Sequence, residues 1–333
     1  MPEIVVNGRF LARPQTGIER YGTSLLKQME GDYRIMEPDR PLNGVLGHMW
    51  EQFAVPMNLS ASSVLWSPAN TGPIFVRNQV ISIHDLSPLE HPEWFRFGFA
   101  AWYWAFWPLL IRRVRRILVP SEHVKRRLIA RFGPRPISVI HEGVDTTWFR
   151  PDAAKPAFPL PSRYVLFVGS IEPRKNLNGL LKAWNSIKRD YKGTWLLIAG
   201  SPQSVFARVR LTPDLERVRF LGYVPESDLP GLYAGAALFV LPSFDEGFGL
   251  PVLEAMACRT PILASDGGAL PEIVGNAGIV FHLADPCGLT DSLRRYLGDP
   301  DLRRDMGEAG LERARAFTWR RAAQHVSKEL HAS

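Results

Sequence analysis

Two glutamates lie eight positions apart in the second half of the sequence, in a segment that joins a glycine-containing loop to an apolar run. Glu246 stands beside Gly247 and Gly249, and Glu254 follows where the apolar residues have helical spacing. A carboxylate accepts hydrogen bonds from sugar or ribose hydroxyls, and glycine leaves backbone amides accessible to a ligand. The pattern therefore favours binding of a hydroxyl-rich ligand, with two surface glutamates beside a turn as the alternative.

Two adjacent cations follow another short apolar run, Tyr164–Val168. Gly169 comes directly after this run, and Arg174 and Lys175 precede a segment with helical periodicity. Cations at a helix entry, together with the free amides of the first helical turn, suit an anion such as a diphosphate. A surface turn with two solvated cations is the other interpretation.

Three further positions come after expected strands. His84 could hydrogen-bond a hydroxyl or carry a proton, or it could be a structural histidine. Gly17 stands where a phosphate or a glycan could approach backbone amides, but the GxGxxG pattern of a simple NAD-binding domain is missing. Gly267 and Gly268 permit close backbone approach, which an ordinary turn between a strand and a helix would also use.

The elements that must position these residues alternate between short β-branched runs and longer segments with apolar i, i+3, i+4 spacing. This alternation predicts an α/β fold with parallel sheets covered by helices on both faces. The expected strands of the first half are Ile4–Asn7, Val64–Trp66, Val80–His84, Arg116–Pro120 and Ile137–His141. Those of the second half are Tyr164–Val168, Trp195–Ala199, Val218–Leu221, Ala237–Leu241, Pro261–Ala264 and Gly278–Phe281.

Residues 144–162 contain four prolines and no periodicity, as is typical of an interdomain linker. We therefore predict two Rossmann-like domains, residues 1–155 and 156–315, and we hypothesise that a helix at 316–333 packs back on the first. Ligands of open α/β sheets bind beyond the carboxyl ends of the strands. Two such sheets facing each other would form a cleft lined by the residues named above.

Composition and charge narrow the classes of partner. The chain has 333 residues and a formal net charge of +7, and residues 1–150 carry 18 basic against 13 acidic residues. Nucleic acid, anionic lipid or a phosphorylated substrate could explain this excess, but no nucleic-acid-binding motif accompanies it. The two cysteines are expected to be buried, reduced thiols of a cytoplasmic protein, and the first residues read as a strand rather than a signal peptide.

An aromatic and basic stretch spans residues 94–116. Its apolar run is too short for the roughly 20 residues that cross a bilayer. An aromatic helix ending in an arginine cluster could lie on an anionic membrane surface. A core helix with a solvated basic end is the alternative.

Together these segments resemble the retaining glycosyltransferases of family 4, which have the GT-B fold, and the resemblance covers nearly the whole chain. Its most specific element is the E-x7-E pattern of Glu246 and Glu254. Residues 47–52 and 119–125 resemble segments of members that build bacterial surface polysaccharides. The resemblance implies two Rossmann-like domains, the first binding the acceptor and the second binding the nucleotide sugar.

The resemblance also implies roles in the second half of the chain. Glu246 would contact the donor sugar, Glu254 would hold the ribose, and Lys175 would neutralise the diphosphate with Gly169 beside it. The backbone amides that accompany Glu246 in this resemblance belong to Gly247, Phe248, Gly249 and Leu250. Many members have arginine directly after the glycine of the phosphate loop, where this chain has Ser170, so Arg174 is expected to substitute for that cation.

In the first half, Thr16-Gly17 resembles the N-terminal glycine loop of the family and His84-Asp85 resembles its histidine facing the donor sugar. Breaking the sugar–phosphate bond leaves negative charge on the diphosphate, which fixed cations and helix amides stabilise. No Asp-x-Asp element follows a strand, so we expect neither a metal nor another cofactor. A front-face reaction, in which the leaving phosphate oxygen helps to deprotonate the acceptor, and a covalent intermediate on Glu246 both stay open.

The sequence thus predicts a cytoplasmic transferase that moves a hexose, with mannose from GDP-mannose as one candidate, to a glycan or lipid-linked acceptor in surface polysaccharide synthesis. Its expected partners are the donor, this acceptor and an anionic membrane at the inner face of the cell membrane, but not nucleic acid. A sugar-nucleotide epimerase and a non-enzymatic nucleotide- or glycan-binding protein are the competing functions, and the E-x7-E pattern favours transfer.

Overall fold

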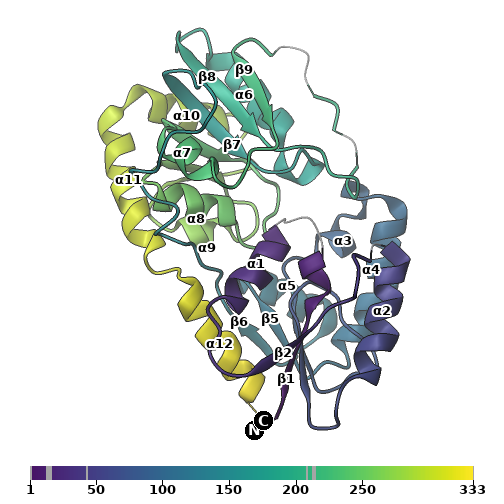
Figure 1. The fold of residues 1–333 in the computed structure, drawn as a ribbon. Helices are drawn as coiled ribbons and strands as arrows, with labels where there is room; N and C mark the ends of the chain where they lie inside the picture. Colours follow the sequence, from purple (N-terminus) through teal and green to yellow (C-terminus); the bar gives the residue numbers. More distant parts are fainter. Residues whose placement is uncertain (1, 13–16, 43, 208, 212–214, 333) are drawn as a thin grey trace. The chain divides into compact units, whose positions relative to one another are not determined.

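The structure, a computed structural model, describes residues 2–12, 17–42, 44–207, 209–211 and 215–332. The chain divides into two compact units. Unit 1 comprises residues 1–90, 98–143 and 319–333, and unit 2 comprises residues 91–97 and 144–318. Figure 1 shows the elements of both units in the colours of the sequence.

Unit 1 contains a six-stranded parallel sheet with the order β2-β1-β3-β4-β5-β6. Its strands are β1 (Ile4–Asn7), β2 (Tyr33–Met36), β3 (Val64–Ser67), β4 (Gln79–Ser82), β5 (Arg116–Val119) and β6 (Ile137–Val139). The helical elements associated with it are η1 (Gly8–Ala12), α1 (Gly17–Leu26), α2 (Gly44–Met57), α3 (Ser87–Glu90), α4 (Phe97–Ile111), α5 (Glu122–Phe132) and α12 (Trp319–His331).

Alternate residues of these strands point to opposite faces of the sheet, and each face is covered by its own helices. Val6 and Trp66 point to the face on which Leu25 of α1 and Val326 of α12 pack. The opposite face is covered by α2, through Val55, and by α4 and α5. Each strand therefore supplies apolar side chains to both faces of the sheet, which is why the strands of a buried parallel sheet are continuous apolar runs.

Unit 2 contains a second six-stranded parallel sheet with the order β12-β11-β10-β7-β8-β9. Its strands are β7 (Arg163–Val168), β8 (Thr194–Ala199), β9 (Val218–Gly222), β10 (Leu238–Leu241), β11 (Ile262–Ser265) and β12 (Ile279–Phe281). Its helical elements are η2 (Pro92–Trp94), η3 (Pro173–Lys175), α6 (Leu177–Ile187), α7 (Leu229–Ala234), α8 (Leu250–Ala257), α9 (Leu270–Val274), α10 (Gly288–Gly298) and α11 (Pro300–Ala314).

The expected α/β class with two parallel sheets is confirmed, and most strands fall where the β-branched runs predicted them. Strand β2 was not predicted, because it is the edge strand of its sheet and its residues are only half-buried or exposed. Two features of the division differ from the expected boundaries. Residues 91–97 group with unit 2, and the expected linker begins inside unit 2, where Val144 and Phe149 are buried in the core. Helix α12 lies in unit 1, where its apolar face is buried.

Candidate functional site

The sheet of unit 2 reverses its direction of growth between β7 and β10. From β7 the chain adds β8 and β9 on one side, and then β10, β11 and β12 on the other. At such a switch point the two loops that leave the neighbouring strands diverge, and α/β proteins bind their ligands there. The loops are residues 169–176 after β7 and 242–249 after β10, so the two most informative segments of the sequence meet at this point.

Glu246 and Lys175 form a buried ion pair at the switch point. The Lys175 Nζ lies 2.6 Å from Glu246 Oε1, and the Ser243 hydroxyl donates to the same oxygen at 2.6 Å. Arg174 contributes a longer contact, with Nη1 3.4 Å from Glu246 Oε2. Only 5% of Glu246 and 6% of Lys175 is exposed, so the two charges interact with little screening by solvent.

The charge state of Glu246 follows from these contacts. Burial alone raises the pKa of this carboxyl group, but the charges of Lys175 and Arg174 and the hydrogen bonds from Lys175 and Ser243 outweigh burial and lower the pKa below its ordinary value. Glu246 is therefore ionised at neutral pH. An ionised carboxylate only accepts hydrogen bonds, which suits contact with hydroxyl groups and excludes Glu246 as a resting general acid.

Side-chain and backbone contacts fix the two loops to each other. The Phe244 amide donates to the Arg174 carbonyl oxygen at 2.8 Å, and Asn176 Nδ2 donates to the Pro242 carbonyl oxygen at 3.1 Å. The C-cap position of η3 and the N-cap position of α6 coincide at Asn176, which adopts a left-handed conformation. These contacts hold together the two loops that carry Lys175 and Glu246, and they thereby fix the position of Lys175.

Arg174 is held in place by Glu172, which also accepts a hydrogen bond from Ser170. The Ser170 hydroxyl donates to Glu172 Oε2 at 2.6 Å, and Arg174 Nε donates to Glu172 Oε1 at 2.9 Å. Glu172 is buried, so its carboxylate connects the serine that replaces the expected arginine with the nearby guanidinium group. This arrangement gives Arg174 a fixed place beside Glu246, whereas its predicted contact with a diphosphate stays a prediction.

The residues after Glu246 lead directly into α8. Gly247 is buried, the Phe248 side chain packs in the core of unit 2, and Gly249 is the N-cap residue with φ of 110°. Leu250 is the first residue of α8 and packs against the same core. The side chains of Phe248 and Leu250 therefore serve packing, and only their backbone amides are candidates for the predicted ligand contacts.

Gly267 and Gly268 lie against the backbone of the Glu246 loop. A Cβ atom at Gly268 would lie 2.3 Å from both the Glu246 N and O atoms, and a Cβ at Gly267 would lie 2.2 Å from the Ser243 carbonyl oxygen. The Ala269 amide donates to the Glu246 carbonyl oxygen at 2.8 Å. The paired glycines therefore allow the Glu246 loop to approach closely, and this contact between the two loops fixes the position of Glu246.

Glu254 lies on α8 and is 2% exposed. The Tyr233 hydroxyl of α7 donates to its Oε2 atom at 2.8 Å. Tyr233 in turn is fixed by the Thr260 hydroxyl, which donates to its carbonyl oxygen at 2.7 Å. Contact of Glu254 with a ribose stays a prediction, and nothing in the sequence around Tyr233 marked it as a partner of the second glutamate.

His84 belongs to unit 1, beyond the carboxyl end of β4. Its Nδ1 atom lies 3.3 Å from Glu142 Oε1 and its Nε2 atom lies 2.9 Å from the Pro68 carbonyl oxygen. The Tyr21 ring contacts the imidazole edge-on, with centroids 4.5 Å apart. Burial alone lowers the pKa of His84, but Glu142 and the Pro68 carbonyl outweigh it and raise the pKa. His84 can therefore carry a proton near neutral pH.

Gly17 is the first residue of α1 and is exposed. Thr16, with which it was expected to form a glycine loop, lies outside the residues that the structure describes, as do residues 13–15.

Glu142 follows β6, so the rule of inspecting residues after strands would have found this partner of His84. The same rule would have found Ser243, which lies directly beyond β10.

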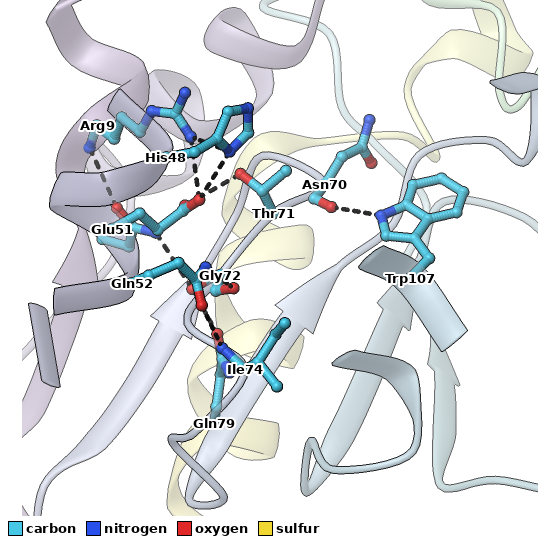
Figure 2. Close-up of polar contacts among 12 residues, drawn as sticks. Arg9, His48, Glu51, Gln52, Asn70, Thr71, Gly72, Ile74, Gln79 and Trp107 are labelled. Carbon is cyan, nitrogen blue, oxygen red and sulfur yellow. Dashed lines mark hydrogen bonds and ion pairs between the residues drawn. The ribbon is translucent and has the colours of Figure 1, made fainter. Parts of the chain in front are cut away.

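A second buried charge cluster occupies the switch point of unit 1, between β1 and β3 (Figure 2). Glu51 of α2 accepts from Asn7 Nδ2 at 2.7 Å and from the Thr71 hydroxyl at 3.0 Å, and its Oε2 lies 3.0 Å from Arg9 Nη1. His48, one turn earlier, lies 3.0 Å from the same Arg9 nitrogen. Burial raises the pKa of Glu51, but His48, Arg9 and Asn7 together lower it. These contacts attach α2 to the sheet of unit 1.

The two cysteines differ in their exposure to solvent. Cys258 is buried, and burial raises the pKa of its thiol to about 12. Cys287 is exposed, contrary to the expectation of two buried thiols, because it precedes α10 at the N-cap position. Within the described residues, no three histidine, cysteine or acidic side chains gather as a metal site would require. No helix in that part of the chain has the length and apolarity to span a bilayer.

Comparison with solved structures defines the class of fold. WaaG, a glycosyltransferase involved in lipopolysaccharide biosynthesis, superposes with a TM-score of 0.72 over 99% of this chain and 100% of that chain, at 14% identity. Sucrose-phosphate synthase from Thermosynechococcus elongatus superposes with a TM-score of 0.71 over 99% and 98% of the two chains, at 18% identity. The two parallel α/β units are those of the GT-B fold.

Comparison with sequence families is more specific. The family model of glycosyl transferases group 1 matches residues 149–313, and that of glycosyltransferase family 4 matches residues 62–148. The two models together match residues 62–313, so the similarity of this chain to glycosyltransferases extends over most of its sequence.

Curated relatives include O-antigen chain mannosyltransferase B of Escherichia coli, 41% identical over 162 residues, which are 47% of this chain and 42% of that protein. The O-antigen chain mannosyltransferase RfbU of Salmonella typhimurium is 27% identical over 79% of this chain and 72% of its own length. D-inositol 3-phosphate glycosyltransferase of Corynebacterium kroppenstedtii is 30% identical over 66% of this chain and 53% of its length. The matches to the first and third of these proteins thus span only about half of their length.

Proposed function

We propose that the protein transfers a hexose from a nucleotide diphosphate sugar to an acceptor, with retention of the anomeric configuration. The observation that carries the proposal is the buried contact of 2.6 Å between Lys175 and Glu246 at the switch point of unit 2. It joins a fixed cation and an ionised carboxylate, the two groups that a sugar bound through a diphosphate requires. Unit 2 would bind the donor and unit 1 the acceptor.

In this proposal each residue at the switch point has one task. Glu246 accepts hydrogen bonds from hydroxyls of the donor sugar, and the amides of Gly247 to Leu250 approach the ligand beside it. Lys175 and Arg174 stabilise the negative charge that develops on the diphosphate as the sugar–phosphate bond breaks. Glu254 holds the ribose after exchanging or sharing its hydrogen bond from Tyr233. With these cations in place, the reaction needs neither a metal ion nor another cofactor.

The relatives support a particular donor and acceptor. Two of them are named O-antigen chain mannosyltransferases, which supports mannose as the sugar, GDP-mannose as the donor, and a glycan or lipid-linked acceptor in surface polysaccharide synthesis. An acceptor of this kind is consistent with a cytoplasmic enzyme at the inner face of the cell membrane. There the aromatic and basic residues 94–116 would contact anionic lipid.

The experiment is transfer of radiolabelled sugar from a panel of nucleotide sugars to lipid extracted from polysaccharide-producing bacteria. We expect incorporation from one donor and none from the others. Glu246→Ala separates the competing functions. A transferase loses turnover in this variant, whereas a non-enzymatic binding protein shows no transfer in either form. Conversion of the donor to an epimer, without any acceptor, would instead identify an epimerase.

A further inference from the structure

Helix α2 carries a stripe of exposed apolar side chains along its outer surface. Val45, Met49, Phe53 and Met57 are spaced four residues apart, so they lie on one side of the helix. Their exposed fractions are 74%, 51%, 63% and 84%, and Leu46 beside them is 61% exposed. A helix at the surface of a globular protein normally turns such a stripe toward the core. Here the opposite side of α2, with Val55, faces the sheet.

Helix α4 has the same property. It contains no charged residue, and Tyr103, Trp107 and Leu110 fill the core between the helix and the sheet. On its outer side Trp104 is 67% exposed and Leu109 is 50% exposed. The alternatives that the sequence left open for this stretch were a core helix and a surface-binding helix, and the structure shows that α4 has both a core side and a bare apolar side.

The outer surfaces of α2 and α4 adjoin each other. The His48 ring of α2 contacts the Trp102 ring of α4 with centroids 4.5 Å apart, and the two helices run beside each other (Figure 1). Phe75, 74% exposed, lies under the guanidinium group of Arg113, just beyond the end of α4. We call this surface the α2–α4 face. It consists of Val45, Leu46, Met49, Phe53, Met57, Phe75, Trp102, Trp104 and Leu109.

The α2–α4 face is firmly attached to the body of unit 1. Glu51 holds α2 through Asn7, Thr71 and Arg9 (Figure 2), and the Trp107 Nε1 atom donates to the Asn70 carbonyl oxygen at 2.8 Å. Both helices are therefore anchored by buried polar contacts on the side away from the face. Contiguous exposed apolar side chains on a single chain are typical of interaction sites, whereas apolar residues exposed singly are not.

The charges around the face indicate the kind of partner. The sole acidic residue in α2 and α4 is Glu51, and it is 1% exposed. Residues 98–143 contain nine arginine or lysine residues and only two acidic residues. Five of these cations are exposed: Arg112, Arg113, Arg126, Arg131 and Arg135. Arg112 and Arg113 directly follow α4, Arg126 and Arg131 lie on α5, which shares the core of α4, and Arg135 lies in the segment after α5.

We propose that the α2–α4 face docks on an anionic lipid bilayer, with its apolar side chains in the interfacial region and the arginines that follow α4 and lie on α5 against lipid phosphates. The proposal rests on the membrane contact suggested above and identifies the surface that makes it. Trp, Phe and Met on one side, with five exposed cations at the flank against one exposed acid, Glu122, suit binding to such an interface. A second copy of this chain would bring like charges together.

The test is flotation of the purified chain with vesicles of phosphatidylcholine alone or with about a third phosphatidylglycerol. We expect binding to the anionic vesicles that weakens with added salt. Phe53→Ser and Trp104→Ser should each weaken binding on the order of tenfold, because each removes a large apolar side chain from the interface. The matched control is Tyr223→Ser, which removes an aromatic side chain that is 76% exposed in unit 2 and should leave binding unchanged.

A second readout does not depend on how tightly the protein binds. Acyl chains brominated near the headgroup should quench part of the tryptophan fluorescence of vesicle-bound protein, and Trp104→Phe should reduce that part to the share of Trp102. Binding that survives Phe53→Ser and Trp104→Ser without change would overturn the proposal. So would a chain that ignores vesicles and sediments as a dimer that Phe53→Ser dissociates, since the face would then bind a second copy.

Failure here can be told apart from failure of the proposed function. The face lies in unit 1, whereas the predicted donor loops lie in unit 2, so Phe53→Ser should leave stabilisation by nucleoside diphosphate unchanged in a thermal-shift assay. Sugar transfer without vesicle binding would refute the α2–α4 face alone. Vesicle binding without any response to nucleotide sugars would refute the glycosyltransferase proposal alone.

Discussion

Replacing Lys175 with methionine removes one charge from the predicted diphosphate site and keeps most of the side-chain volume. The unit charge of a lysine about 4 Å from a phosphate oxygen is worth about 4 kcal/mol at an effective dielectric constant near 20. Only the part that grows as charge develops on the leaving group affects turnover, and Arg174 remains nearby. We therefore expect kcat to fall on the order of 100- to 1000-fold, the usual effect of losing one such electrostatic contact.

The same change has a cost in stability, because it leaves the Glu246 carboxylate with one fewer partner. Breaking a buried ion pair costs about 3–5 kcal/mol. The value here should lie at the low end, since the Ser243 hydroxyl at 2.6 Å and Arg174 at 3.4 Å still contact Glu246. The double variant Lys175→Met/Glu246→Gln removes the stranded charge. It should regain stability without regaining turnover, which separates the two effects.

The assay is steady-state transfer of labelled sugar, with the folded fraction of each variant determined by circular dichroism. Lys182→Met is the matched control, because Lys182 is an exposed lysine of α6, whereas Lys175 lies just ahead of that helix. This control should retain wild-type turnover. Folded Lys175→Met protein with turnover close to that of wild type would refute the assignment of Lys175 to the diphosphate.

Three more predictions concern single contacts. The pKa of Glu246 is lowered in the folded protein, so the stability that its carboxylate contributes is complete above pH 4.5 and is lost as the pH falls through the lower folded pKa. Glu246→Gln should therefore reduce the loss of stability at acid pH, measured by denaturant unfolding over a series of pH values. Glu142→Gln should lower the pKa of His84 in an NMR titration, since Glu142 is what raises it; an unchanged pKa would contradict this. Gly268→Ala should cost roughly 2 kcal/mol more than Gly31→Ala in urea unfolding, because both have positive φ but only Gly268 meets a backbone.

The parallel sheets could be predicted because their strands are buried on both faces. Runs such as Tyr164–Val168 are continuously apolar, as is typical of strands buried on both faces of a parallel sheet. The edge strand β2 has no such signal, since Arg34 and Ile35 are exposed and the pattern of a buried run is lost. The predicted linker is irregular in both sequence and structure because its prolines prevent regular strand pairing, even where Phe149 packs into a core.

The candidate site could be predicted in part. Lys175 and Glu246 were found because each follows a strand, and sheet topology then brings β7 and β10 together. The spacing did not predict the hydrogen bonds around them. Ser243 and Glu172 lie within three residues of their partners, but side-chain geometry decides which groups they contact, and Tyr233 reaches Glu254 from 21 residues away. The paired glycines were read as space for a ligand or as an ordinary turn, and their actual neighbour is the backbone of the Glu246 loop.

Hydrogen–deuterium exchange with and without GDP-mannose, or with whichever sugar nucleotide supports transfer, would locate the donor site on the chain. We expect the donor to slow exchange in residues 169–176 and in residues 244–254. Mannose alone should leave both segments unchanged. Protection of other segments, with these two exchanging as in the free protein, would contradict a donor site built on Lys175 and Glu246.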